Sequence, residues 1–213
     1  MCLHFDLSHE KATQALNYFA LENGGEINKM KALKLIYLAD RYHLRKYGRP
    51  VVGDDYWAMK QGPVASMTKD LADKNPGLDE CEREYADRYL TTSEDKLYLT
   101  TASPVDTQVF SDSDEEALSF AWAAFRTLGE WELAELTHAY PEWDKHRESL
   151  ASGTCKRARM DYADFFLDTE PGHPKLACVD QHDAFVEIVS EHERLLAQET
   201  MVELAHLRAL WNR

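Results

Sequence analysis

Apolar residues recur at helical spacing near the start of the chain. Leu16 and Phe19 share one helical face behind a candidate N-cap at Ser8, and the Asn-Gly-Gly run at 23–25 stops the pattern. Glycine and asparagine commonly follow the last turn of a helix, because they adopt the left-handed backbone conformation easily. The pattern therefore predicts a first helix over residues 8–23.

The segment from Asn28 to Tyr47 carries apolar side chains on more than one helical face. Its apolar positions run from Met30 to Leu44 with few interruptions, Asn28 stands where an N-cap belongs, and Gly48 follows as a terminator. A helix that is apolar on several faces has to be covered on several sides. We expect residues 30–46 to form the central and most buried helix.

One acidic residue interrupts this apolar helix. Asp40 falls on the face of Leu33, Tyr37 and Leu44, because side chains at three-, four- and seven-residue spacing point the same way. A buried carboxyl group needs hydrogen-bond or cationic partners. We therefore expect Asp40 to be at least partly buried and to accept a hydrogen bond.

The next elements are shorter. The aromatic segment 56–60 has the composition of a strand or an extended connector. Gly62 and Pro63 end it, and Pro63 is expected near the first turn of a third helix that ends at about residues 75–77. Residues 85–101 contain two β-prone runs around a Ser-Glu-Asp turn, which predicts a hairpin.

Helical spacing returns in the second half of the chain. A cap at Ser113 predicts a helix that Gly129 ends, and apolar residues predict three more helices. These cover residues 131–139, 141–149 and 179–212. The fold class expected is mainly α: a single helical domain over residues 1–213, with a small β-hairpin or short antiparallel sheet and a long C-terminal helix.

The composition of the chain bears on its cellular location and on whether it binds a metal or cofactor. No run of about 20 apolar residues and no leader-like start is present, so the protein is expected in the cytoplasm without a membrane partner. The four cysteines are widely spaced and lack metal-finger partners. The nine histidines form no pair at i, i+4 spacing, so we expect no metal and no other cofactor.

Charge is unevenly distributed along the chain. The net charge is −14, with 14 Lys and Arg against 17 Asp and Glu in residues 1–110 and 10 against 21 in residues 111–213. Such acidity disfavours nucleic acid as the main ligand. Residues 29–49 nevertheless hold seven basic residues and one acid, which indicates either a solvated helix face or a positive stripe.

No catalytic motif is visible. The glycine-rich phosphate-binding patterns, the paired-histidine zinc motif and the Gly-x-Ser-x-Gly elbow are all missing. Residues 40–43 combine acid, base and phenol, but consecutive residues on a helix point in different directions and do not converge. These observations favour a binding protein over an enzyme.

Two blocks resemble a known family. ALKLIYLADRYHLRKYGRP at 32–50 precedes YWAMKQGPV at 56–64, and LAELTHAYPEW at 133–143 supplies the second block. In order and spacing these runs resemble the Panacea domain, also called SocA-like, with a core over about residues 30–146. The C-terminal segment 151–213 lies outside the resemblance.

The resemblance implies an antitoxin of a bacterial or phage toxin–antitoxin pair. Its partner would be a cognate protein toxin encoded by the adjacent gene, and a homo-oligomer stays open. The implied structural motif positions are Lys34, Tyr37, Asp40, Gly48, Pro50, Thr137 and His138. The candidate toxin-binding residues are Tyr56, Trp57, Lys60, Gly62, Pro63, Val64 and Trp143.

Three alternatives to simple blocking stay open. A proteolytic adaptor would deliver the toxin for degradation, as a SocA-like relative does. An enzyme would need a pocket with converging titratable groups. A DNA-binding regulator would use the basic residues of 29–49 and bind with a steep salt dependence.

Overall fold

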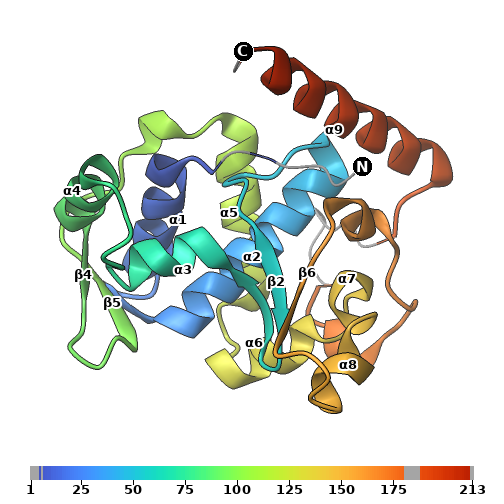
Figure 1. Cartoon of the computed structure of the whole chain (residues 1–213), viewed down its shortest axis with the longest axis horizontal. Helices are drawn as coiled ribbons and strands as arrows, with labels where there is room; N and C mark the ends of the chain where they lie inside the picture. The colour runs from blue at the N-terminus through green and yellow to red at the C-terminus, as the bar shows by residue number, and fades with distance from the viewer. Residues whose placement is uncertain (1–4, 6, 180–187, 212–213) are drawn as a thin grey trace.

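Helix α2 (Lys29–Tyr47) lies at the centre of the fold, and α1, α5, α6 and α9 pack around it (Figure 1). The structure is a computed structural model that describes residues 5, 7–179 and 188–211. All side chains from Ala32 to Arg45 are buried. The predicted central helix is confirmed, because apolar coverage on several faces requires neighbours on several sides.

The caps of the first two helices also follow the sequence. Ser8 caps α1 (His9–Glu22) through its side chain, and Asn28 caps α2 by accepting from the amides of Met30 and Lys31. Gly48 ends α2 with a φ of 71°, the left-handed conformation that favours glycine.

The remaining helices are α3 (Ser66–Ala72), α4 (Glu80–Tyr89), α5 (Asp112–Phe125), α6 (Glu130–Thr137), α7 (Pro141–Asp144) and α8 (Arg147–Ala151), with 3₁₀ turns at Thr107–Val109, Tyr162–Phe166 and Pro174–Leu176. Of these helices, α3, α5 and α6 pack against α2. Helix α4 was not predicted, because its residues are mostly charged and polar and Ala86 is the one buried residue in it. The α5 cap was predicted two residues late, since Ser111 forms the capping box.

The predicted hairpin forms part of a larger sheet. Strands β4 (Leu90–Thr92) and β5 (Tyr98–Thr101) pair antiparallel, and β1 (Glu26–Asn28) adds to the free side of β5. The register places Ile27 opposite Leu99. Both side chains are buried, so the short strand β1 is held by packing as well as by pairing.

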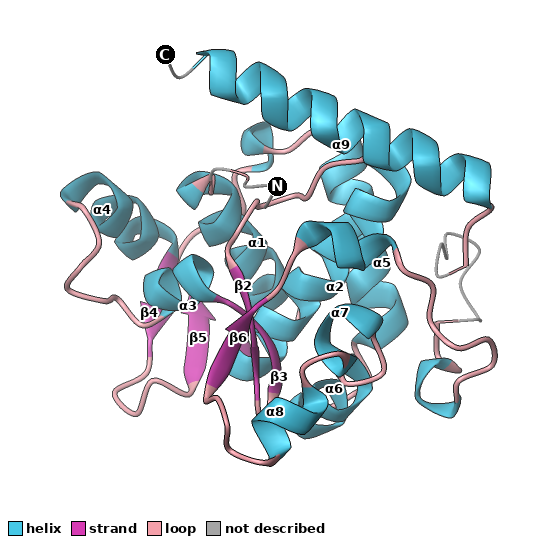
Figure 2. Cartoon of the chain, turned by 45° about the vertical axis from the view of Figure 1, so that its right-hand side comes forward, coloured by secondary structure: helices cyan, strands magenta, loops and turns pink. Residues whose placement is uncertain are grey.

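The second sheet has the order β3–β2–β6. Strand β2 (Tyr56–Met59) turns directly into β3 (Gly62–Ala65), and β6 (Arg157–Arg159) pairs with its other side (Figure 2). Pro63 therefore lies in a strand opposite Ala58, and its expected place in a helix is wrong. Proline suits this strand because it lies at the sheet edge, where its missing N–H leaves no ladder bond unmade.

Helix α9 (Glu191–Trp211) closes the fold at the end opposite α6 (Figures 1 and 2). The predicted start at Val179 is wrong, because Val179 lies in a turn; residues 180–187 of that prediction lie outside the described residues. Ala197 and Met201 are buried and face the body of the protein. A Cβ on Gly48 would lie 2.7 Å from the Ala197 carbonyl oxygen, so glycine also allows α9 to approach α2 closely.

Candidate functional site

The two sequence blocks meet around Lys34. This lysine comes from α2, and its Nζ donates a hydrogen bond to the Pro63 carbonyl oxygen at 2.5 Å. Only 2% of Lys34 is exposed, and burial lowers the pKa of its ammonium to about 7. The contact joins the central helix to the β2–β3 hairpin through a charge that is costly to bury.

Gly62 makes this approach possible. Its φ is +91°, and a Cβ built on it would lie 2.5 Å from Thr137 Oγ1 and 2.9 Å from Lys34 Nζ. Any other residue would therefore meet both backbone strain and steric conflict. The Gly-Pro-Val segment is thus explained by packing of the hairpin against α2 and the end of α6.

A stacked pair supports the other side of the hairpin turn. The rings of His138 and Trp143 lie 3.7 Å apart between centroids and 18° from parallel. Trp143 Nε1 donates to the Met59 carbonyl oxygen at 2.9 Å. Burial lowers the pKa of His138 to about 4, so the imidazole is neutral at pH 7. We define the hairpin cluster as Lys34, Gly62, Pro63, Thr137, His138 and Trp143.

Asp40 holds the chain that leads into this hairpin. One carboxylate oxygen accepts from the backbone amides of Val51 (2.8 Å) and Val52 (3.0 Å), and the other accepts from the Tyr56 hydroxyl (2.9 Å). Asp40 is 1% exposed, so the predicted buried and hydrogen-bonded carboxyl group is confirmed. Burial raises the pKa of Asp40 to about 7, although all three donors favour the ionised form.

A buried ion pair joins α2 to α7 beside the cluster. The Tyr37 hydroxyl donates to Glu142 Oε1, and Arg41 Nε donates to the same oxygen at 2.8 Å. The Arg41 guanidinium also lies 4.3 Å from the ring centroid of Tyr140. Tyr37 was predicted as a structural position, whereas Glu142 was not, because its place directly before Trp143 is the only local signal for it.

The four polar residues 40–43 point to four different partners. Asp40 faces the loop after α2 and Arg41 faces α7, while Tyr42 donates to Glu116 of α5. His43 contacts the Arg49 carbonyl oxygen and Ser113, and burial lowers its pKa to about 4. The prediction that these residues do not converge on one reactive point is confirmed.

The candidate toxin-binding residues gather at the β2–β3 hairpin, but they differ in exposure. Tyr56, Gly62, Pro63 and Trp143 are buried, and Pro50 and Gly48 of the structural set are buried as well. Trp57 and Val64 are half-buried, and Lys60 is exposed at the turn. Direct contact with a partner therefore stays a prediction for these last three. The buried members pack inside the protein and hold the hairpin in place.

A groove of about 640 Å³ opens next to the cluster. Its walls are the first turns of α2, the β2–β3 turn, the start of β5 and the first turn of α6. Lys34 and Pro63 form part of its floor, which places the cluster directly beneath it. Trp131 (60% exposed), Leu97 (53%) and Tyr98 (41%) stand on its rim.

Sequence reasoning did not assemble this groove. Trp131 is one of five tryptophans in the chain, and tryptophan is more often buried than exposed, so little in the sequence indicates that Trp131 lines a groove. Leu97, Tyr98 and Lys156 carried no such indication, because they come from segments that are far apart along the chain and meet only in the folded protein.

The basic residues of 29–49 do not form a free positive stripe. A wholly solvated face is wrong for Lys34, Arg41 and Arg45, which are each 2% exposed. Buried Arg45 pairs with Asp168. The more exposed basic residues also have partners within the protein. Lys29, Lys46 and Arg49 pair with Asp73, Glu116 and Asp114, and Lys31 donates to the Arg126 carbonyl oxygen. These cations stabilise the fold and are not available as a set for phosphate contacts.

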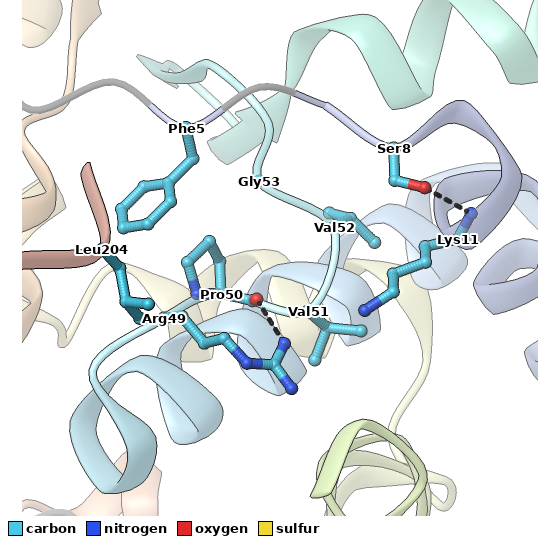
Figure 3. A pocket seen from close by; sticks show the side chains of 9 residues that line it. All are labelled: Phe5, Ser8, Lys11, Arg49, Pro50, Val51, Val52, Gly53 and Leu204. Carbon is cyan, nitrogen blue, oxygen red and sulfur yellow. Dashed lines mark hydrogen bonds between the residues drawn. The ribbon is translucent and has the colours of Figure 1, made fainter. Parts of the chain in front are cut away.

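A smaller pocket lies between α9 and the body (Figure 3). It measures about 80 Å³, room for a few water molecules. Lys11 and Arg49 line it, but both form ion pairs with buried Asp114, at 2.7 Å each. Leu204 of α9 forms one wall. The pocket is a packing gap beneath α9 with its cations already neutralised.

The described part of the chain has no arrangement typical of a metal centre or a membrane span. Residues 5, 7–179 and 188–211 contain no group of three or more His, Cys, Asp or Glu that could hold a metal ion. In the same residues, every helix is too short or too polar to cross a bilayer.

Comparison with known proteins identifies one family. Residues 33–144 match the family model described as antitoxin SocA-like, Panacea domain. The match runs from the first turns of α2 to the end of α7 and includes every member of the hairpin cluster. No curated protein and no solved structure gives a significant match.

Proposed function

Because this chain belongs to the antitoxin SocA-like, Panacea domain family, we propose that it is an antitoxin that neutralises a cognate protein toxin by binding it directly in the cytoplasm. The observation that carries the proposal is the family match over residues 33–144. This region contains most of α2, the β2–β3 hairpin, α6 and α7. The first three of these elements line the groove, and α7 contributes Trp143 to the cluster.

The chemistry of the site supports binding over catalysis. Lys34, His138 and Trp143 are engaged in packing, stacking or hydrogen bonds that hold the hairpin. General acid–base catalysis needs a donor and an acceptor aimed at one reacting atom. The exposed side chains at the groove include Trp131, Tyr98 and Met59, and aromatic residues and methionine are enriched at protein interfaces.

The engaged cations count against a DNA-binding regulator. Phosphate recognition requires several Lys or Arg side chains that are free to replace counterions. In residues 29–49 each basic side chain already has a partner within the protein. We propose no cofactor, because neutralising a toxin by direct binding requires a binding surface and no reactive centre.

Co-expression with the product of the neighbouring gene tests the proposal. We expect that product alone to inhibit growth, and the pair to grow normally and to co-purify as a complex. Following the toxin by immunoblot separates two modes: a stable toxin indicates blocking, and a toxin with a shortened half-life indicates delivery to a protease. Unrelieved toxicity together with no complex between the purified proteins would contradict the antitoxin function.

A further inference from the structure

We propose that the groove binds an acidic segment of the toxin that also carries apolar side chains. This inference rests on the proposed function and adds the surface and the chemistry of the partner. We define the lysine groove as the concave surface lined by Asn28, Lys29, Met30, Leu33, Lys34, Met59, Lys60, Gln61, Pro63, Val64, Lys69, Leu97, Tyr98, Glu130, Trp131 and Lys156.

Exposed apolar side chains define the first requirement on the partner. Trp131, Leu97, Tyr98 and Met59 are 60%, 53%, 41% and 37% exposed, and all four line the same groove. They come from α6, from the turn before β5, from β5 itself and from β2. Large side chains left this exposed together mark an interaction site, because burying them against a partner removes apolar area from water.

The charge of the groove defines the second requirement. The net charge of the chain is −14, yet the ionisable residues among the described groove lining are five lysines and a single glutamate, Glu130. Lys34 is buried, so the other four lysines carry the accessible positive charge. Lys29 and Lys69 share one carboxylate, Asp73. The groove is therefore a local positive region on a negative protein.

Two of these lysines are open to a partner's carboxylates. Neither Lys60 nor Lys156 has an acidic partner among the described residues, and both stand at the groove. Screening limits the reach of charge to about 8 Å at physiological salt, so a docked segment senses these lysines more than the distant acidic surface. Carboxylates between apolar anchors would match both features of the groove.

Nucleic acid fits the same surface less well. Single strands need cations along the backbone and flat aromatic platforms for the bases. Trp131 and Tyr98 could supply platforms, but Leu33, Leu97 and Met59 are aliphatic and Glu130 would repel phosphate. The net charge of −14 adds a further repulsion that a polyanion experiences along its whole length.

A second copy of this chain also fits less well. Helix α9 is acidic, and it exposes Leu195, Leu196, Val202 and Leu207. It lies at the end of the molecule opposite α6, whose first turn lines the groove (Figure 2). A groove that captured α9 of another copy would make a head-to-tail contact, which produces open chains of molecules unless the rotation happens to close a ring.

Charge reversal in the groove tests the inference. Lys60→Glu with Lys156→Glu should weaken toxin binding at least about 30-fold, since like charges facing each other across an interface cost several kcal/mol. Trp131→Ala should weaken it by about 30-fold, because it removes the most exposed aromatic side chain at the groove. The control pair Lys74→Glu with Lys175→Glu makes the same change in net charge at two residues that do not line the groove, and it should leave the affinity within about threefold.

The measurement is the Kd of each full-length variant for the purified neighbouring-gene product, with circular dichroism melting curves to verify folding. Wild-type affinity should fall with added salt more steeply than that of the Lys60→Glu, Lys156→Glu protein. If every groove variant binds the toxin with wild-type affinity, the groove is not the toxin-binding surface, but the proposed antitoxin function remains. Absence of wild-type binding would overturn both.

Two further outcomes would also reject the inference. In the first, a single-stranded oligonucleotide displaces the toxin, and Trp131→Ala weakens the binding of both by the same factor. The groove would then be a nucleic-acid site. Self-association that is lost in the Lys60→Glu, Lys156→Glu protein, with toxin affinity unchanged, would assign the groove to a second copy of the chain. A charge swap that places lysine at an acidic toxin position and restores binding to the glutamate variant would support the inference directly.

Discussion

The Lys34 ammonium and the Pro63 carbonyl oxygen lie 2.5 Å apart in a buried contact between the central helix and the β2–β3 hairpin. Lys34 is thus a cation inside the protein with one backbone acceptor and, among the residues that the structure describes, no carboxylate partner. The arrangement positions the hairpin and makes the free energy of unfolding depend on whether Lys34 carries its proton.

The Lys34→Met variant should reveal this dependence on pH. Burial lowers the pKa of Lys34 from 10.5 to about 7, so between pH 7 and pH 10.5 the unfolded chain binds more protons at this site than the folded one. Wild-type stability should therefore rise relative to Lys34→Met across that window, by at most about 1.4 kcal/mol per pH unit. Below about pH 6, where Lys34 is protonated in both states, the difference should be constant.

Urea unfolding at several pH values measures this difference. Lys60→Met provides the control for loss of one lysine, since Lys60 is exposed at the hairpin turn. A wild-type minus Lys34→Met difference that stays flat from pH 7 to pH 10 would show that Lys34 keeps its charge, and with it its usual pKa, in the folded protein.

Gly62→Ala should destabilise the protein by about 2–4 kcal/mol, because strain at positive φ adds to a conflict with close neighbours. The new Cβ would lie 2.5 Å from Thr137 Oγ1 and 2.9 Å from Lys34 Nζ. Gly153→Ala is the matched control, with a φ of +73° and no atom within 4 Å of the Cβ. It should cost about 1 kcal/mol from backbone strain alone. Equal melting temperatures for the two variants would remove the steric argument.

Asp40→Ala should cost about 1–3 kcal/mol, because it leaves three buried donors without an acceptor. These donors are the amides of Val51 and Val52 and the hydroxyl of Tyr56. Asp40→Asn keeps an oxygen for the two amides and should cost less. Chemical denaturation of both variants checks the order, and an unchanged melting temperature for Asp40→Ala would contradict the inferred role of the carboxyl group.

Removal of residues 191–213 should lower stability by about 2–4 kcal/mol while leaving toxin affinity within about threefold, if the lysine groove is the binding surface. The loss of stability follows from Ala197 and Met201, which α9 buries against the body. Leu196→Ala with Leu207→Ala removes two outward side chains without removing the helix and should change neither property. Loss of toxin binding in both proteins would instead make α9 the interface.

Several elements could be predicted because their signals are local. Helix α2 has its caps at Asn28 and Gly48 and its apolar residues within 20 positions, so periodicity and capping chemistry suffice. The β4–β5 hairpin needs only two β-prone runs and a turn. The burial of Asp40 follows from its place on an apolar helical face, whichever residues cover that face.

The tertiary structure alone decided which residues share the site. Arg41 bonds to Glu142 and Lys34 bonds to Pro63, although each pair is far apart in the sequence. Strand β2 pairs with β6, and helices α5 to α8 lie between these two strands in the sequence. No periodic pattern encodes such pairs, because their energy arises only when the intervening segments have packed. Burial of Lys34 and exposure of Trp131 reverse what composition favours for each residue. The exposure of each side chain depends on which elements pack against it, and this is decided only when the whole chain has folded.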